Sequence, residues 1–237
     1  MRESDWNITP KEAVQLQKEL REHVNLVPLT HPPTIVGGCD VSMNRFAKEG
    51  FAGFVTMSFP DLIRIDHSVV KDRIPFPYVP GLLSFREIPM LLKAWEKLTI
   101  KPEVLVVDGI GIAHPRRLGI ATHLGIILDL PTIGCAKSVL TGTYQEPGNN
   151  PGDISYLYDT YNKTEIIGAA LRTKTNVKPV FISAGHLIIL EESLELIMKS
   201  VRKHRLPEET RIAHNTVNEY RIRDGLHGTD HSQPSLA

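Results

Sequence analysis

The chain of 237 residues has little of several features that mark special classes of protein. It contains two cysteines, Cys39 and Cys135, which are too few for a disulfide framework and do not have the spacing of metal ligands. No apolar run reaches the roughly 18 residues of a membrane span, and the N-terminus has no apolar signal core. These absences exclude a disulfide miniprotein and predict a cytoplasmic protein without a membrane partner.

The chain also lacks an excess of charge of either sign, because 27 Lys and Arg balance 27 Asp and Glu. With 41% hydrophobic and 23% charged residues, its composition is that of an ordinary globular protein. A zero total argues against a surface that is basic all over, but a local basic patch remains open. The segment 199–223 is such a place, since it holds seven basic residues and three acids.

The N-terminal third predicts a helix and then three strands. Thr9, Pro10 and Glu12 form the signature of a capped helix start, and the helix would run to His23. Three short apolar segments follow with short links between them, which predicts an antiparallel meander. We expect these strands at residues 34–41, 51–59 and 62–70.

The pattern then changes to alternating helices and strands. We expect helices at 84–98 and 116–130 and strands at 103–108 and 131–136. This order predicts an α/β fold with a mixed five-stranded central sheet flanked by helices, in which the first and fourth strands are neighbours. Further strands near 154–158, 165–171 and 179–182 and helices at 190–204 and 208–221 would complete one domain of residues 1–223. We expect residues 224–237 to form a disordered tail.

Three acids fall at one edge of this predicted sheet. Asp40 lies near the end of the first strand, Asp108 ends the fourth, and Glu87 lies in the first turn of the helix between them. Three converging carboxylates would repel one another unless a divalent cation such as Mg²⁺ neutralised them. Simpler explanations exist for two of them, since Asp108 fits a turn and Glu87 fits a capping box with Ser84. Asp40 is harder to dismiss, because a charge in a buried strand is costly.

Four sequence blocks carry a resemblance to a known family. They are GCDVS at 38–42, PYVPGLLSFRE at 77–87, DGIGIAHPRRLG at 108–119 and PTIGCAKS at 131–138, with weaker matches at 179–186 and 211–214. The chain resembles the endonuclease V family of deoxyinosine-specific nucleases, which has a ribonuclease H-like fold. The resemblance covers about residues 9–220.

The resemblance implies a Mg²⁺-dependent DNA repair endonuclease, for which Mn²⁺ can substitute. Such an enzyme recognises hypoxanthine in DNA and hydrolyses the second phosphodiester bond on its 3′ side, leaving 3′-hydroxyl and 5′-phosphate ends. Asp40, Glu87 and Asp108 would hold the metal, and Lys137 and His214 would complete the catalytic set. Taken alone, Lys137 would be an ordinary solvated lysine and His214 a surface histidine of a helix.

The resemblance also implies groups that recognise the base. Pro77, Tyr78, Val79 and Pro80 match the family's wedge, in which a stiff backbone presents an aromatic ring where a base leaves the stack. Glycines permit the close approach that a flipped base needs, although each could simply make a tight turn. The implied base pocket consists of Gly81, Leu83, Gly109, Gly111 and Ile120.

A basic segment beside Asp108 predicts contacts with phosphate. His114, Arg116 and Arg117 are expected to open the helix at 116–130, so that side chains and helix N-terminus together bind a phosphate. The basic segment at 199–223 could also hold the DNA backbone, although a charged helix face is more often only solvated.

Three positions depart from the family pattern. Ile110 stands where many members have histidine, and Leu187 and Ile189 stand where members commonly have Arg and Ser. The implied metal ligands are intact, so we expect activity to survive. The change at Ile110 leaves the base preference open.

Other functions remain to be weighed against this one. The same chemistry could act on inosine-containing RNA, because no motif here reports on the 2′-hydroxyl. A non-catalytic binder of inosine-containing nucleic acid would be expected to lack Asp40, Asp108 or Lys137, and all three are present. A nucleotide-binding domain is disfavoured because the glycine motif at Gly109 and Gly111 lacks its third glycine. The absence of heptads and linkers predicts a monomer.

Overall fold

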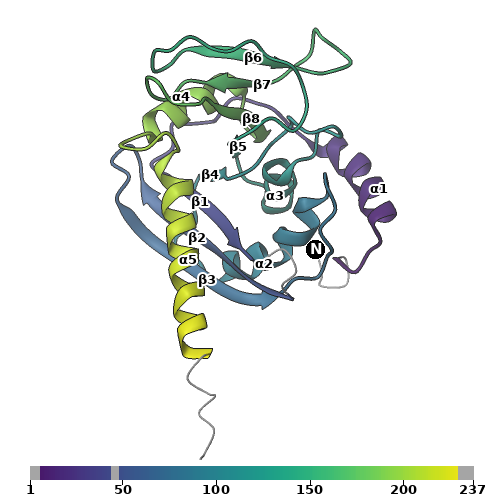
Figure 1. The fold of residues 1–237 in the computed structure, drawn as a ribbon, viewed down its shortest axis with the longest axis vertical. Helices are drawn as coiled ribbons and strands as arrows, with labels where there is room; N and C mark the ends of the chain where they lie inside the picture. Colours follow the sequence, from purple (N-terminus) through teal and green to yellow (C-terminus); the bar gives the residue numbers. More distant parts are fainter. Residues whose placement is uncertain (1–5, 44–47, 229–237) are drawn as a thin grey trace, which may run out of the picture.

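A single mixed sheet of eight strands, with helices on both faces, forms the frame of the molecule (Figure 1). The structure is a computed structural model that describes residues 6–43 and 48–228, with side chains as far as residue 225. The strands follow one another across the sheet in the order β3-β2-β1-β4-β5-β8-β7-β6. The α/β class expected from the sequence is therefore confirmed.

The first three strands form the antiparallel meander that the sequence predicts. The next two strands run parallel to β1, and β1 and β4 are direct neighbours, as expected. Strands β4 and β5 are buried along their whole length, which explains their continuous apolar sequences. These strands are β1 (Ile35–Ser42), β2 (Glu49–Ser58), β3 (Arg64–Arg73), β4 (Val104–Val107) and β5 (Thr132–Ala136).

The expectation of a five-stranded sheet is wrong, because the three later strands extend the same sheet. The β8 strand pairs antiparallel with β5, β7 pairs with β8, and β6 forms the outer edge. Without β8, the completely buried β5 would leave its backbone groups unpaired at an edge. The added strands are β6 (Ile154–Tyr158), β7 (Ile166–Leu171) and β8 (Val180–His186).

The helices cover the two faces of the sheet unequally. Helices α2 and α3 pack on one face, and α4 and α5 pack on the other, where α5 crosses β1 and β2 (Figure 1). In the described part of the chain, no helix has the length and apolar character needed to cross a membrane. The helices are α1 (Pro10–Leu20), the 3₁₀ turn η2 (Arg21–His23), α2 (Leu83–Lys97), α3 (Ile120–Leu128), α4 (Leu190–Ser200) and α5 (Glu208–Gly228).

The ends of three helices test the sequence predictions. The capping box at α1 is confirmed, since the Thr9 hydroxyl accepts from the Glu12 backbone N–H and the Glu12 carboxylate accepts from the Thr9 N–H. The predicted helix start at residue 116 is wrong, because Arg117 has a left-handed φ of 58° and α3 begins only at Ile120.

The C-terminal helix is longer than expected and includes the first residues of the predicted tail. Helix α5 continues to Gly228, and the Asp224 carboxylate in its last turns lies 2.8 Å from the Lys71 ammonium on β3. The remainder of the predicted tail, residues 229–237, lies outside the described part of the chain.

Two separate apolar cores hold the layers together. One lies between the sheet and helices α2 and α3, around Phe54, Phe85 and Leu105. The other lies under α4, around Val106, Ile182 and Ile197. Because β-strand side chains alternate between faces, neighbouring residues of β4 contribute to opposite cores. This alternation places Asp40 on the α5 face of β1 and Cys39 on the face of α2.

Helix α5 rests directly on the backbone of β1 and β2. A Cβ atom at Gly38 would lie 2.2 Å from the carbonyl oxygen of Glu209, and one at Gly53 would lie 2.9 Å from the Val217 side chain. Glycine at both positions therefore permits an approach that any other residue would block. Asp40 lies two residues beyond Gly38 on the same face of β1, so this contact sets the height of α5 above Asp40.

Glu209 is a buried carboxylic acid in the first turn of α5. Its side chain is fully buried; Oε1 accepts a hydrogen bond of 2.5 Å from the Ser200 hydroxyl, and Oε2 has no partner among the described residues. Burial raises the pKa of this group from its ordinary 4.5 to about 7, although the Ser200 hydrogen bond opposes the shift. The folded protein therefore favours the protonated form.

Substitution of Gly38 by alanine should destabilise the protein by about 3 kcal/mol, because the new methyl group meets the backbone of α5. Denaturant unfolding would measure this loss. Gly225→Ala is the matched control, since no atom lies within 4 Å of the position of its Cβ atom and alanine favours a helix. Equal stabilities of the two variants would show that Gly38 does not set the packing of α5.

Glu209→Gln should remove a pH dependence of stability. Because the folded-state pKa is raised, the contribution of Glu209 is fully present below about pH 4.5 and is lost as the pH rises through about 7. The loss amounts to about 3 kcal/mol for a shift of this size. Unfolding in urea should therefore show that the free energy of unfolding of the variant rises relative to that of the parent protein between pH 4.5 and 8. The exposed Glu191→Gln should show no such gain, and equal behaviour of the two would contradict the assignment.

Candidate active site

Asp40 and Asp108 lie side by side at one edge of the sheet, as the sequence predicts. Strands β1 and β4 are parallel, and their register pairs Cys39 with Val107, so the next residues on each strand are the two acids. Their side chains are 11% and 20% exposed, respectively. The strand pairing alone therefore brings two partly buried carboxylates together.

Glu87 joins them from helix α2. It is the fifth residue of that helix and lines a cavity of about 220 Å³ together with Asp40 and Asp108. The capping-box explanation is wrong, because Leu82 occupies the N-cap and the Ser84 hydroxyl lies 3.0 Å from Nδ1 of His123. The three acids that the sequence singled out thus share one cavity.

Burial and the charges of neighbouring acids make the Glu87 and Asp40 carboxylates hard to ionise. The pKa of Glu87 is raised to about 8 by burial and then by the charges of Asp40 and Asp108. Burial raises the pKa of Asp40 to about 6, although nearby His214 opposes the shift. A divalent cation would relieve this repulsion, and carboxylate oxygens are the ligands that Mg²⁺ prefers. Across residues 6–43 and 48–228, however, no three His, Cys, Asp or Glu side chains stand in the arrangement of a metal centre.

Lys137 comes directly after β5 and forms an ion pair with the Asp108 carboxylate. Its side chain is 46% exposed, so the ammonium lies at the mouth of the site. The structure therefore places the lysine that the resemblance singles out beside one acid of the cluster. A cation in this position can stabilise negative charge on a group bound beside Asp108.

His214 lies over Asp40 because α5 lies on β1. Nδ1 of His214 is 3.1 Å from the Asp40 carboxylate, and Nε2 is 2.9 Å from the side-chain nitrogen of Asn218. The Ser42 hydroxyl in turn donates to Oδ1 of Asn218 at 2.7 Å. Because the Asn218 amide donates to Nε2, the proton of the neutral ring is on Nδ1 and faces Asp40. The sequence reading missed Asn218, although its spacing of four residues from His214 places both on one face of the helix.

The segment of the predicted wedge is anchored at the carbonyl oxygen of Gly81. Three side chains donate to this oxygen: Gln17 at 3.1 Å, His114 through Nε2 at 3.1 Å and Arg116 at 2.8 Å. Burial and then Arg116 lower the pKa of His114 to about 4, so the ring is neutral, and its Nδ1 accepts from the Arg116 backbone N–H. Tyr78, the residue expected to act as a wedge, is 56% exposed three residues before this anchor. The sequence analysis did not identify Gln17, which is buried on α1.

The expected phosphate site at His114, Arg116 and Arg117 does not form at a helix start. The first two side chains are used at the Gly81 anchor, and Arg117 lies 2.8 Å from both the Asp159 and the Glu165 carboxylates. All three therefore tie loops of the protein to one another. All three residues lie three or more residues before α3, which begins at Ile120, so they do not form the N-terminus of that helix.

The predicted base pocket is divided by the structure. Leu83 and Ile120 line the cavity that holds the acids, and the missing Cβ of Gly109 makes room for the Ile120 side chain. Gly111 instead packs against β8, where its N–H donates to the Ser183 hydroxyl at 2.8 Å. Gly81 has a left-handed φ of 77° in the turn before α2, so glycine suits the conformation there.

Two residues that depart from the family pattern lie at different ends of the sheet, because β8 runs antiparallel to β5. Ile110 packs against Ala136 and Phe181, and Leu187 follows β8 with its N–H bonded to the carbonyl of Asn25 at 2.7 Å.

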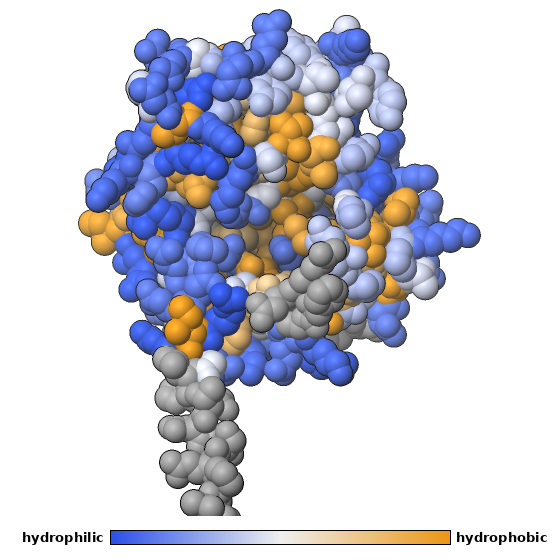
Figure 2. All heavy atoms as spheres, in the orientation of Figure 1, coloured by the Kyte–Doolittle hydropathy of each residue, from blue (hydrophilic) through white to orange (hydrophobic). Residues whose placement is uncertain are grey.

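Hydrophobic side chains also gather near the middle of the face shown in Figure 2, with hydrophilic side chains around them.

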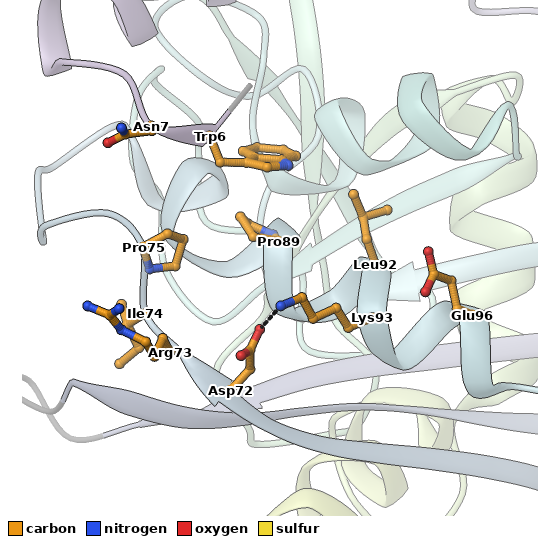
Figure 3. A pocket seen from close by; sticks show the side chains of 10 residues that line it. All are labelled: Trp6, Asn7, Asp72, Arg73, Ile74, Pro75, Pro89, Leu92, Lys93 and Glu96. Carbon is orange, nitrogen blue, oxygen red and sulfur yellow. Dashed lines mark ion pairs between the residues drawn. The ribbon is translucent and has the colours of Figure 1, made fainter. Parts of the chain in front are cut away.

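A larger cavity lies on the opposite side of α2 from the acids. It measures about 730 Å³, and Figure 3 shows Trp6, Pro75, Pro89 and Leu92 around it. The ion pair between Lys93 and Asp72, 2.7 Å long, joins α2 to β3 within it. This cavity holds no convergent acids of the active-site type, so size alone does not identify the site.

Asn218→Ala should change the proton position on His214, because the variant loses the donor to Nε2. Side-chain ¹⁵N chemical shifts of His214 at pH 8 would measure it, and the shift pattern should move away from that of the Nδ1–H form. Asn215→Ala, one residue beyond His214 on the exposed side of α5, is the control. An unchanged spectrum for Asn218→Ala would contradict the orienting role.

Comparison with known proteins identifies the family of the chain. The family model described as Endonuclease V matches residues 18–215. The endonuclease V of Dictyoglomus turgidum is 49% identical over 205 residues, which cover 86% of this chain and 87% of the relative.

Solved structures agree in fold. Endonuclease V from Streptomyces avermitilis has a TM-score of 0.88 at 38% identity and covers 94% of this chain and 97% of its own. Endonuclease V from Ciona intestinalis, in complex with a 24mer DNA containing an inosine followed by a ribo-adenosine, has a TM-score of 0.78 at 26% identity and covers 90% and 98%. The chain belongs to the endonuclease V family and is an endonuclease.

Proposed function

We propose that this endonuclease is a Mg²⁺-dependent DNA repair enzyme that recognises deoxyinosine and hydrolyses the second phosphodiester bond on its 3′ side. The products would carry 3′-hydroxyl and 5′-phosphate ends. The observation that carries the proposal is the meeting of Asp40, Glu87 and Asp108 in one cavity, with Lys137 and His214 at its margins. The inosine in the Ciona complex supports the choice of lesion.

We also propose that the sheet contains a ribonuclease H-like core. The strand order β3-β2-β1-β4-β5, with three antiparallel and then two parallel strands, supports this assignment. Strands β8, β7 and β6 would then be an extension of that core. The acids lie within the core part, on β1 and directly after β4.

The acidic cluster fits a divalent metal ion by its chemistry. Asp40, Glu87 and Asp108 offer only hard oxygen ligands. The pKa values of Asp40 and Glu87 are raised first by burial and then by the charges of the neighbouring acids, and a cation would relieve that repulsion. Asp40, Glu87 and Asp108 would hold Mg²⁺, or Mn²⁺ in its place. When bound, such a metal supplies an activated water and neutralises charge on the phosphate.

The remaining roles belong to side chains of the chain itself. The Lys137 ammonium would stabilise charge on the scissile phosphate, since it lies beside Asp108 at the mouth of the site. The His214 ring, oriented by Asn218, would hold the Asp40 carboxylate through Nδ1–H. These contacts keep two of the acids in place before substrate enters.

Base recognition would use the segment between β3 and α2. Tyr78 would insert between bases, and the prolines around it and the Gly81 anchor would keep its backbone still. Leu83 and Ile120 would contact the flipped base, because they line the cavity of the acids. Gly81 and Gly109 would allow the base to approach the backbone.

Inosine-containing RNA is the second candidate substrate. The Ciona structure has a ribo-adenosine after the inosine, which favours a site that accepts a ribonucleotide there. The 2′-hydroxyl would distinguish the two substrates.

Two free, buried cysteines fit a reducing compartment, and we propose that the protein acts in the cytoplasm.

The test of function uses matched DNA and RNA oligonucleotides that each carry one inosine, with Mg²⁺ or with a chelator. We expect nicking of the DNA past the lesion, no nicking with chelator, and a loss of at least about 10³-fold in kcat for Asp108→Ala. Gel separation of end-labelled products would give the bond that is cut. Asp61→Ala, an exposed acid in the turn after β2, should keep full activity.

Two outcomes would change the proposal. Binding without cleavage in both Mg²⁺ and Mn²⁺ would contradict the enzyme and leave a binder of inosine-containing nucleic acid. Cleavage of RNA in preference to DNA would replace the substrate but keep the chemistry.

A further inference from the structure

A second groove lies beside the active site, where the end of β1, the start of β2 and the end of β3 meet the last turns of α5. Its volume is about 670 Å³. Glu49 pairs with Arg73, and Phe51 pairs with Lys71, across β2 and β3. The alternation of strand side chains puts these four residues on the face of α5. The lining consists of Ser42, Met43, Lys48, Glu49, Phe51, Lys71, Arg73 and Arg221.

The groove is strongly basic although the whole chain is neutral. Four basic residues and one acid line it. Lys71 is partly neutralised, because Asp224 lies 2.8 Å and Glu49 lies 3.5 Å from its ammonium. Within the described residues, no carboxylate lies at ion-pair distance from Lys48, Arg73 or Arg221, so their charges are available to a ligand.

Most other bases of the C-terminal segment are used inside the protein. Lys199 and Arg211 pair with neighbouring glutamates, and Arg202 and Arg205 donate to backbone carbonyls. The basic segment at 199–223 therefore does not form one continuous phosphate-binding face. Arg221 differs from these residues, because it lines the groove together with Lys48, directly before β2, and with Lys71 and Arg73 of β3, which are distant in sequence.

The groove is continuous with the active site. Ser42 lines the groove and donates to Asn218, which holds His214 against Asp40. His214, Asn218 and Arg221 are spaced by four and three residues, so they follow one stripe of α5. Along that stripe, Arg221 lies about 10 Å beyond His214. A strand with a phosphate at Asp40 could thus continue into the groove.

We propose that this groove binds the phosphate backbone of the substrate strand outside the cleaved bond, without regard to sequence. Lys48, Arg73 and Arg221 would contact phosphates, and the ring of Phe51 would contact a sugar or base. The Lys71 ammonium lies 5.9 Å from the centre of that ring, which keeps positive charge beside the apolar surface. This inference rests on the proposed function for the identity of the strand.

The test measures binding without cleavage. Fluorescence anisotropy in the presence of a chelator would follow a labelled oligonucleotide with one inosine, and a matched one without it, over a series of salt concentrations. The triple variant Lys48→Gln, Arg73→Gln, Arg221→Gln should reduce the magnitude of the slope of log affinity against log salt by roughly 2 to 3. Binding then neutralises fewer phosphates and therefore releases fewer counterions from the nucleic acid. Its Kd at low salt should rise at least tenfold for both oligonucleotides.

A second triple variant provides the control. Lys11, Lys163 and Lys178 are exposed lysines on other parts of the surface, and their change to glutamine lowers the net charge equally. The control should keep the salt slope of the parent protein. Equal losses in the two triple variants would show that only total charge matters and would overturn the proposal. Thermal unfolding of the triple groove variant would show whether it still folds. The single variant Arg73→Gln would test the loss of one contact with less change to the protein.

Cleavage kinetics distinguish this inference from the proposed function. In the triple groove variant, KM for a long inosine substrate should rise while kcat stays within about twofold, because these residues do not touch the reacting atoms. Loss of binding to both oligonucleotides by a protein that cuts neither would support the groove and contradict the proposed function. Normal binding and normal KM in the triple variant would overturn the groove alone. A variant that loses binding to polyglutamate but not to the oligonucleotides would also overturn it, in favour of an acidic protein partner.

Discussion

The packing of α5 against the backbone of β1 is the contact on which the site depends. Gly38 leaves no room for a side chain beneath Glu209, so the helix rests on the strand itself. Five residues further along the helix, His214 lies above Asp40, which is two residues further along the strand. A strand advances about twice as far per residue as a helix. Five residues of α5 therefore cover about the same distance as two residues of β1. A helix lifted by one methyl group could not hold this alignment.

The same contact organises the electrostatics of the site. Asp40 is partly buried between the sheet and α5, and His214 opposes the rise in its pKa that burial causes. The Lys137 ammonium, directly after β5, forms an ion pair with the Asp108 carboxylate. Glu87 has Arg86 as a nearby opposing charge, yet its pKa remains raised to about 8. The cluster is therefore bordered by Lys137, Arg86 and the His214 ring and remains repulsive at its centre.

Some features followed from the sequence because they depend on short-range rules. A buried run that ends in an acid places that acid at a sheet edge, and the strand order then makes Asp40 and Asp108 neighbours. Other expectations failed where long-range contacts decide. The sequence around Arg117 has the period of a helix, but its ion pairs with Asp159 and Glu165 accompany a left-handed turn instead. Strand β8 reads as an isolated apolar run, and only the unpaired edge of β5 explains its place in the sheet.

By itself, the sequence determined the α/β class, the meander, the acids of the site and the family, because strand periodicity, caps and contiguous motifs are local properties. Tertiary structure alone decided the partners of each charge. His214 reaches Asp40 only because α5 rests on β1, and Gln17 reaches Gly81 across 64 residues of chain. The neutral total charge shows the same division, since only folding gathers Lys48, Arg73 and Arg221 into one groove. Charge is counted along the chain, but the field that a ligand meets is set by distance in space.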